Sequence, residues 1–168
     1  MRWARAFTLI EILIVVVLLA ILAAIVLPSM SKGTVMAKES ALASELSLLR
    51  RFTVLYESQH LEVPPGYPNG DTAAAPTEQT FRDQATLSSN ANGQTAAIGT
   101  PGFKYGPYLS KIPRNPFNDL DTILILGNGQ AFPAVPDGVH GWICKPETGE
   151  IRACNTGTNS AGTSYYDY

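Results

Sequence analysis

Glu11 is the residue whose surroundings most need a chemical explanation. It is the only ionisable side chain between Arg5 and Lys32, and every residue from Ile12 to Leu27 is Ile, Leu, Val or Ala. A carboxylate in such surroundings is costly unless a cation pairs with it. Glu11 therefore calls for a positive partner, which the apolar helix itself does not supply.

Cys144 and Cys154 are a second pair with defined chemistry. Nine residues separate them, which is unlike the C-x-x-C spacing of disulfide-exchange proteins. An N-terminal membrane segment would place them outside the cytoplasm, where a disulfide persists. We predict a disulfide between them. Two free buried thiols are the alternative, because the sequence does not fix the register of the hairpin around Gly149.

No constellation of residues predicts an enzyme. His60 and His140 stand eighty positions apart without a motif around either, and we interpret them as a helix-end residue and a strand surface residue. The chain has no G-x-S-x-G, P-loop or H-E-x-x-H motif, so no catalytic residue is assigned. The formal net charge of −2 argues against nucleic acid as a partner. The one basic cluster with an aromatic residue, 50–52, fits the flank of a buried helix face.

The elements that position Glu11 begin with a short basic leader, residues 1–6, followed by an apolar helix, residues 7–28. At 1.5 Å per residue this helix is about 30 Å long, enough to cross a bilayer. Arg2 and Arg5 precede it, so the positive-inside rule keeps the N-terminus in the cytoplasm. Pro28 removes a backbone hydrogen bond and predicts a helix kink. A monomeric single-pass anchor with a periplasmic binding head is the alternative, but it leaves Glu11 unexplained.

Residues 29–61 predict an amphipathic continuation of the helix, and residues 62–168 predict a β-rich head with a polar C-terminal tail. The apolar stripe of the helix recurs every three, four or seven residues: Val35, Leu42, Leu46, Leu49, Phe52 or Thr53, and Tyr56. Within the head we expect a short helix near 77–87 and a hairpin that turns at Gly149. We expect the tail, NTGTNSAGTSYYDY, to lie at the surface or at a sheet edge, or to be disordered.

The stretch ARAFTLIEILIVVVLLAILAAIVLP resembles the N-terminus of type IV pilins and of type II secretion pseudopilins. Precursors of that family have a basic leader, a small residue before the cleavage point, Phe after it, and Glu four residues further on. Several later segments resemble the major-pseudopilin branch: Leu49-Arg50, Tyr56, Gln59-His60, Pro64–Pro68, Gly106–Leu109, Pro113–Phe117, Gly141-Trp142 and Thr148–Ile151.

The resemblance implies that a prepilin peptidase cleaves between Ala6 and Phe7 and methylates the new amine of Phe7. Ala6 departs from the Gly most often found there, but it is small enough for cleavage. The new amine is the cation that Glu11 lacks, supplied by a neighbouring subunit in the filament.

Several expectations about fold and function follow from the same resemblance. The fold is α+β, a pilin fold in which the second half of the long helix packs on a small antiparallel sheet. The function is that of a structural filament subunit, a pseudopilin that polymerises from the inner membrane and drives protein export. Its partners are further copies in a helical filament, the prepilin peptidase, an inner-membrane assembly platform and minor pseudopilins. The alternative is a type IV pilus subunit for adhesion, motility or DNA uptake.

Calcium is a further ligand to weigh, because major pseudopilins often bind it in a C-terminal loop. Asn118, Asp119 and Asp121 lie close together, but the segment runs directly into the apolar residues 123–126. It lacks the spaced oxygen ligands and the closing Glu of an EF-hand loop. We predict a polar turn and no cofactor, with calcium as the weaker alternative.

Overall fold

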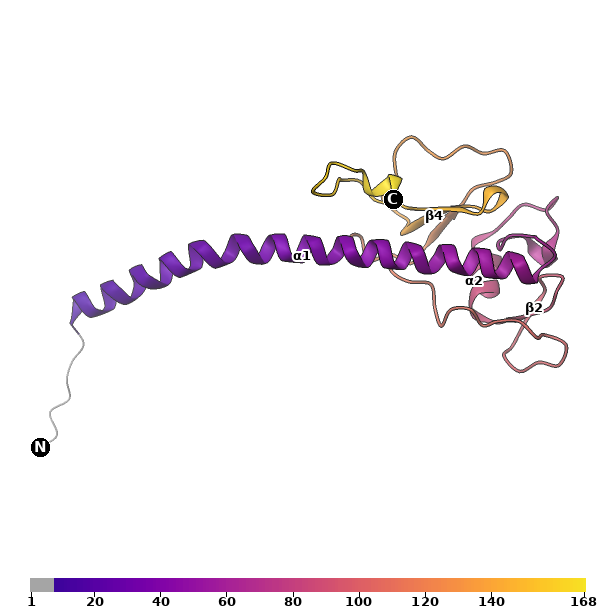
Figure 1. Cartoon of the computed structure of the whole chain (residues 1–168), viewed down its shortest axis with the longest axis horizontal. Helices are drawn as coiled ribbons and strands as arrows, with labels where there is room; N and C mark the ends of the chain where they lie inside the picture. Colours follow the sequence, from indigo (N-terminus) through magenta and orange to yellow (C-terminus); the bar gives the residue numbers. More distant parts are fainter. Residues whose placement is uncertain (1–7) are drawn as a thin grey trace, which may run out of the picture. The chain divides into compact units, whose positions relative to one another are not determined.

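The computed structural model describes residues 8–168, except for the side chains of residues 25–32. The chain divides into two compact units, Met1–Lys38 and Glu39–Tyr168. One helix, α1 (Leu9–Gln59), contributes residues to both units (Figure 1). The other helices and strands that the structure describes belong to the second unit, which we call the head.

The apolar stripe predicted for the second half of α1 forms one wall of the core of the head. Its members there lie three or four residues apart, so they share one face of the helix. All are buried: Leu42, Leu46, Leu49, Phe52 and Tyr56. Val35, the first residue of the predicted stripe, is 43% exposed and lies outside the head.

A second helix, α2 (Glu78–Thr86), confirms the short helix predicted near 77–87. Thr77 caps its first turn, accepting a hydrogen bond from Thr80 N at 3.2 Å. The buried side chain of Gln84 bonds to the backbone of Gly66, Tyr67 and Gly93. This amide thereby joins to the helix both the segment that contains the short 3-10 helix η1 (Pro68–Gly70) and the short turn at Gly93.

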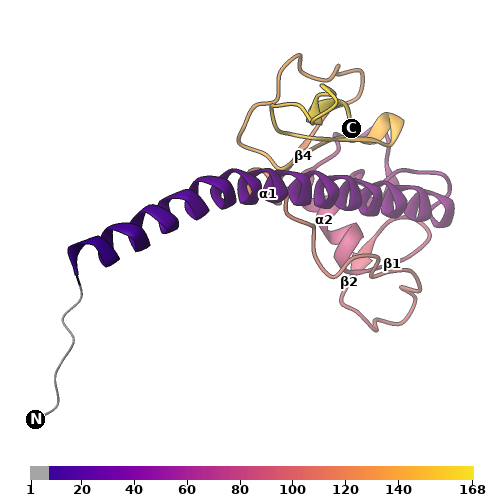
Figure 2. The ribbon, with the colours of Figure 1, turned by 60° about the vertical axis from the view of Figure 1, so that its left-hand side comes forward.

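The strands form two small sheets, so the predicted α+β class is confirmed. Strands β1 (Ser88–Ser89) and β2 (Thr95–Ala96) pair antiparallel. The second sheet has the order β3 (Ile123–Ile125), β4 (Trp142–Lys145) and β5 (Glu150–Ala153). In both Figure 1 and Figure 2, β4 lies on the upper side of α1 and β2 on the lower side.

The larger sheet differs from the prediction in one respect, since it is mixed and not purely antiparallel. Strand β3 runs parallel to β4, whereas β4 and β5 are antiparallel. Parallel neighbours need a long crossover, and the segment from residue 126 to residue 141 supplies it. The predicted hairpin joins β4 to β5 through the 3-10 turn η2 (Pro146–Thr148), and Gly149 takes a φ of 67° as expected.

The predicted disulfide is wrong for this fold, because Cys144 and Cys154 are both free and buried. Cys144 pairs across the ladder with Ile151, and its side chain lies in the main core with Trp142. Cys154 belongs to a separate apolar cluster with Ile143. Since alternate residues of a strand point to opposite faces, the register places the two thiols on opposite sides of the sheet.

Most residues of the C-terminal tail are exposed, as predicted for a surface segment, but its end packs on the head. Tyr165 and Tyr166 are buried, in the 3-10 turn η3 (Tyr165–Asp167). The Tyr165 hydroxyl donates to Glu39 Oε1 at 2.8 Å, and the Tyr166 hydroxyl donates to the carbonyl oxygen of Pro133 at 2.7 Å. Two tyrosine rings bury enough surface to order a segment that lacks aliphatic residues.

Arg50, on α1, forms hydrogen bonds to the end of the tail and to β5. Its guanidinium donates to the carbonyl oxygen of Ile151 at 3.0 Å and also to that of Tyr168. Ile151 belongs to β5, the outer strand of the larger sheet. The arginine therefore occupies part of the edge that β5 would otherwise present to solvent.

Candidate functional site

The N-terminal end of α1 is built around Thr8 and Glu11. Glu11 Oε2 accepts hydrogen bonds from the backbone N–H and from the hydroxyl of Thr8, both at 2.8 Å. In return, Thr8 Oγ1 accepts from Glu11 N at 3.3 Å. This reciprocal pattern is a capping box, which satisfies backbone donors that a helix start leaves open. Glu11 is thus fixed in place, and only one of its two oxygens is used.

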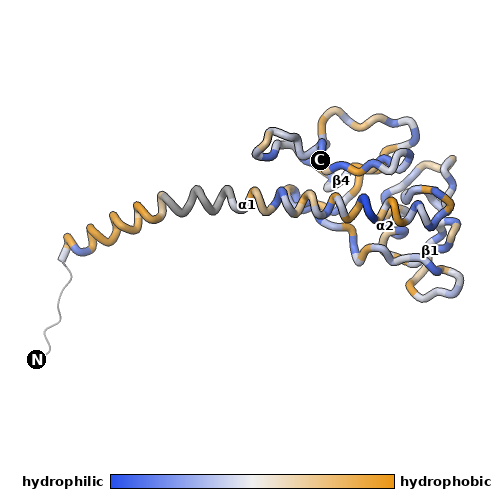
Figure 3. The backbone as a smooth tube through the Cα atoms, in the orientation of Figure 1, coloured by the Kyte–Doolittle hydropathy of each residue, from blue (hydrophilic) through white to orange (hydrophobic). Residues whose placement is uncertain are grey.

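The apolar part of α1 presents its side chains outward on every side. From Leu9 to Leu22 each large apolar residue is about half exposed or more. Figure 3 shows this stretch as hydrophobic, whereas the part of α1 in the head alternates between polar and apolar residues. A helix that is apolar on all sides is normally buried against lipid or against other protein chains.

Several predicted features fall outside the described residues. Ala6 and Phe7, the predicted cleavage and methylation positions, are among them, and so is the side chain of Pro28. The predicted leader 1–6 and kink at Pro28 therefore stay predictions.

Within the residues that the structure describes, no helix is both long enough and apolar enough to span a membrane.

His60 lies just beyond the C-terminal end of α1, as predicted, but it is buried and not at the surface. Its ring stacks on Tyr56, with centroids 3.7 Å apart, and its Nδ1 lies 2.7 Å from the Tyr56 carbonyl oxygen. A carbonyl only accepts, so Nδ1 carries the hydrogen and Nε2 accepts from the Ser89 hydroxyl at 2.8 Å. Burial lowers the pKa of His60, although the hydrogen bond to Tyr56 opposes this. The residue joins α1 to β1 in its neutral form.

His140 lies in the loop before β4 and not in a strand, and it contacts Asp137. The carboxylate of Asp137 accepts hydrogen bonds from His140 Nδ1 at 2.6 Å and from the thiol of Cys154 at 3.1 Å. Burial alone raises the pKa of Asp137, but hydrogen bonds from Cys154, Val139 N and His140 together lower it to about 2. Burial and this carboxylate both raise the pKa of the Cys154 thiol, which makes it a poor nucleophile. Asp137, His140 and Cys154 thus form a hydrogen-bonded structural cluster, which we call the Asp137 clasp.

The three polar residues considered for calcium are engaged by other groups. Asp119 pairs with Arg114 at 3.0 Å, and Asp121 lies 3.5 Å from an Arg82 nitrogen. Asn118 Nδ2 donates to the carbonyl oxygens of His140 and Cys154. Over residues 8–168 the structure shows no group of three or more His, Cys, Asp or Glu side chains arranged to hold a metal ion.

The sequence analysis missed Thr8, although the S/T-x-x-E spacing of Thr8 and Glu11 is a known signal for a capping box. It also missed the Asp137 clasp, for which the sequence carries no comparable signal.

The comparisons with known proteins agree with the geometry at the N-terminus. Residues 4–27 match the family model of the prokaryotic N-terminal methylation motif. No curated protein matches the chain, and neither does any solved structure.

Proposed function

We propose that this chain, whose methylation motif at residues 4–27 indicates the type IV pilin and pseudopilin family, is a pseudopilin of a type II secretion system. In this proposal the leader 1–6 is removed between Ala6 and Phe7, and the new amine of Phe7 is methylated. The mature subunit is anchored in the inner membrane with its head in the periplasm. It then joins a helical filament whose growth drives protein export.

The observation that carries the proposal is the first part of α1, which is apolar all round and holds a single fixed carboxylate. The exposed residues Leu9–Leu22 supply a surface that first lipid and then neighbouring subunits can cover. Apolar contacts of this kind set no register along a helix, because each position resembles the next. A lone charge does set one, since it is stabilised only where a partner charge stands.

The capping box supports a role for Glu11 between subunits. Thr8 uses only the Oε2 oxygen. Among the described residues, Oε1 of Glu11 has no hydrogen-bond partner. In a filament this oxygen is free to accept the Phe7 amine of a neighbouring copy, away from water, where such a pair is stronger than at a wet surface. Glu11 would then select the position at which each new subunit docks.

The secretion branch is favoured over the surface pilus by residues of the head. Many of the residues on which the resemblance to major pseudopilins rests are buried in the core: Tyr56, His60, Tyr67, Leu109, Asn115, Trp142 and Ile151. Asn115, for example, bonds through Nδ2 to the Gly141 carbonyl and to Asn155, which joins two segments of the head. The resemblance is therefore one between residues that build the head.

The proposal implies three partners besides further copies of the chain. A prepilin peptidase performs the cleavage and methylation, an inner-membrane platform adds subunits, and minor pseudopilins begin the filament. Calcium has no assigned role, because the carboxylates of Asp119 and Asp121 already face arginines.

Mass spectrometry of filaments isolated from the native host tests the processing step. We expect a subunit that begins at Phe7 and carries one methyl group. A subunit in assembled filaments that still begins at Met1 or Arg2 would refute the proposal.

Deletion of the gene tests the secretion assignment. We expect exported proteins to accumulate in the periplasm while surface pili remain. Loss of surface pili with normal secretion would instead assign the chain to a type IV pilus.

A further inference from the structure

The C-terminal end of α1 is closed by a strained turn. Glu62 N donates to the Glu57 carbonyl oxygen at 3.1 Å, which is the long bond of a Schellman motif. The left-handed position of this motif normally holds Gly, but here Leu61 occupies it with a φ of 57°. Glu62 follows with a φ of 61°. Two consecutive side chains in this region cost free energy that glycines would not.

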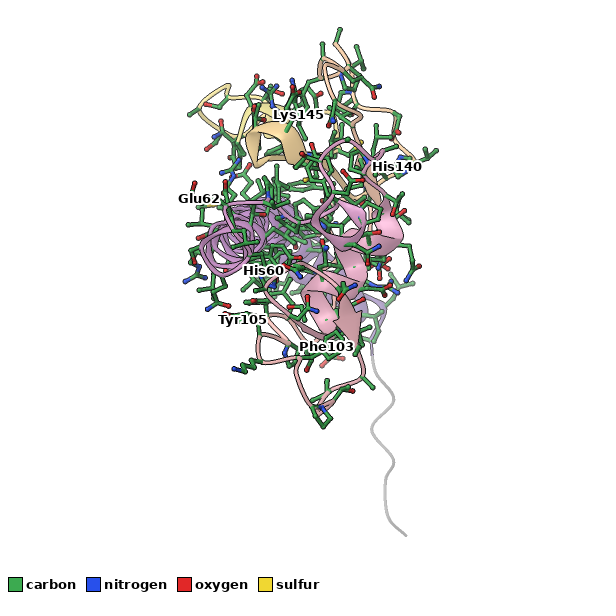
Figure 4. All side chains as sticks on the ribbon, turned by 90° about the vertical axis from the view of Figure 1, so that its right-hand side faces the viewer. His60, Glu62, Phe103, Tyr105, His140 and Lys145 are labelled. Atoms are coloured by element: carbon green, nitrogen blue, oxygen red, sulfur yellow. The ribbon has the colours of Figure 1, made fainter. Side chains whose placement is uncertain are left out.

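The contacts of Leu61 and Glu62 within the head do not explain this strain. Leu61 is 73% exposed, and Glu62 is exposed as well. Over the part of the chain that the structure describes, the Glu62 carboxylate has no ion-pair or hydrogen-bond partner. In Figure 4, which looks onto this end of the head, Glu62 lies at the margin of the molecule. Strained, exposed positions are where binding residues tend to occur. We call Leu61 and Glu62 the corner.

A complementary surface lies on the solvent-facing side of α1, one to four turns earlier. It is a groove of about 480 Å³ lined by Ser47, Arg50, Arg51, Val54, Leu55 and Ser58. Val54 is 68% exposed and Leu55 is 48% exposed, so the floor is apolar. Arg51 donates only to the Ser47 carbonyl oxygen of its own helix, and no carboxylate among the described residues pairs with it. An apolar floor beside an unpaired cation suits a ligand with an apolar side chain next to a carboxylate.

The corner has both features, the apolar side chain of Leu61 and the carboxylate of Glu62. We propose that Leu61 and Glu62 of one copy dock into the groove of the next copy, an inference that rests on the proposed function. Leu61 covers Val54 and Leu55, and Glu62 lies beside Arg51. The surfaces differ, so the contact is head-to-tail. A head-to-tail contact builds an open filament when each step also displaces the copies along one axis, so that no ring closes.

The positions of the two surfaces on α1 predict a dimension of the filament. The corner lies about nine residues beyond the centre of the groove. At 1.5 Å per residue, parallel copies joined by this contact are displaced along the helix by about 13 Å. The axial rise per subunit, measured by electron microscopy of filaments, should be of this order.

Charge reversal in the full-length chain tests the contact. Arg51→Glu and Glu62→Lys each place like charges together, so each should lower the amount of assembled filament by about tenfold. The double variant restores the opposite pair in swapped order and should recover most of the loss. Lys111→Glu makes the same charge change as Arg51→Glu at an exposed lysine outside both surfaces, and it should assemble normally.

Two further variants address the apolar half of the contact. Leu61→Gly relieves the left-handed strain, so it should raise the urea midpoint of the head while lowering filament yield. A loss of stability with unchanged yield would contradict the inference. Val54→Cys with Leu61→Cys should cross-link neighbouring copies within oxidised filaments, because the native cysteines are buried.

The outcomes separate the two proposals. If the wild-type chain forms filaments but the charge reversals assemble normally, or if the double variant is no better than the worse single one, the corner contact is wrong and the filament function stands. If the wild-type chain forms no filament in its own host, the proposed function fails and this contact fails with it.

Discussion

Two stretches of α1 differ in how far their apolar side chains are exposed. In Leu9–Leu22 the large apolar side chains are exposed on every side of the helix, whereas in Leu42–Tyr56 most of them are gathered on one buried face and only a few, such as Val54 and Leu55, are exposed. The first stretch has no core of its own to bury, and the second is a wall of the head. One continuous helix therefore carries two kinds of surface, the first suited to partners outside the chain and the second to its own fold.

Glu11 offers the strongest test of the first stretch. We expect Glu11→Gln to reduce filament incorporation by about a hundredfold, because leaving the Phe7 amine unpaired in a buried interface costs about 3 kcal/mol. Filament yield is measured with the variant as the only subunit present. Cleavage at Ala6 and the urea midpoint of the head serve as controls and should be unchanged. Assembly at the normal rate would show that Glu11 acts otherwise.

A matched pair of leucines sharpens the comparison of the two stretches. Leu46 is 1% exposed in the core, and Leu19 is 59% exposed. In detergent-solubilised subunits, Leu46→Ala should lower the free energy of unfolding of the head by about 2–5 kcal/mol, the usual cost of a buried cavity. Leu19→Ala should leave it within about 0.5 kcal/mol. Similar losses in both variants would contradict the division described above.

His60 extends the comparison to the end of α1, where a titratable group is buried. Its pKa is lowered from 6.5 in the folded state, so the unfolded chain binds the proton more readily. The contribution of neutral His60 to the free energy of unfolding is therefore fully present above pH 6.5 and declines as the pH falls below that value. Urea midpoints measured from pH 7.5 to pH 5 should show the decline in the wild type and in His140→Gln, but not in His60→Gln.

The cysteines give the smallest expected effect. Because Cys144 and Cys154 are free, a reducing agent should leave the urea midpoint of the head unchanged. Reduction of a disulfide across this loop would instead remove about 2–3 kcal/mol. Burial raises the pKa of both thiols, so alkylation should be slow until the head unfolds. Fast labelling of the folded protein would show that the hairpin register is different.

The features that sequence predicted well are those with a local period or turn signal. The stripe from Leu42 to Tyr56 follows the helical repeat, and Gly149 marks a turn that needs a positive φ. Both signals lie within a few residues of the structure they specify, so no knowledge of the rest of the chain was required.

The features that sequence missed depend on partners distant in the chain. Tyr165 is buried in the core, and its hydroxyl donates to Glu39, more than a hundred residues earlier. The two cysteines stay apart because of a ladder register that no local signal encodes. At the N-terminus, Glu11 stood out by its charge, but its cap by Thr8 was missed although the spacing is local.

The way Arg50 covers β5 has a consequence for how copies can join. An open strand edge invites another strand to add to it, and repeated addition leads to amyloid, which is very hard to take apart. Arg50 occupies the Ile151 carbonyl, and the C-terminal segment is tied to the same arginine through Tyr168. Growth by strand addition is thereby disfavoured at this edge. The proposed contacts between copies use side chains of α1 instead, and contacts of that kind can be released one subunit at a time.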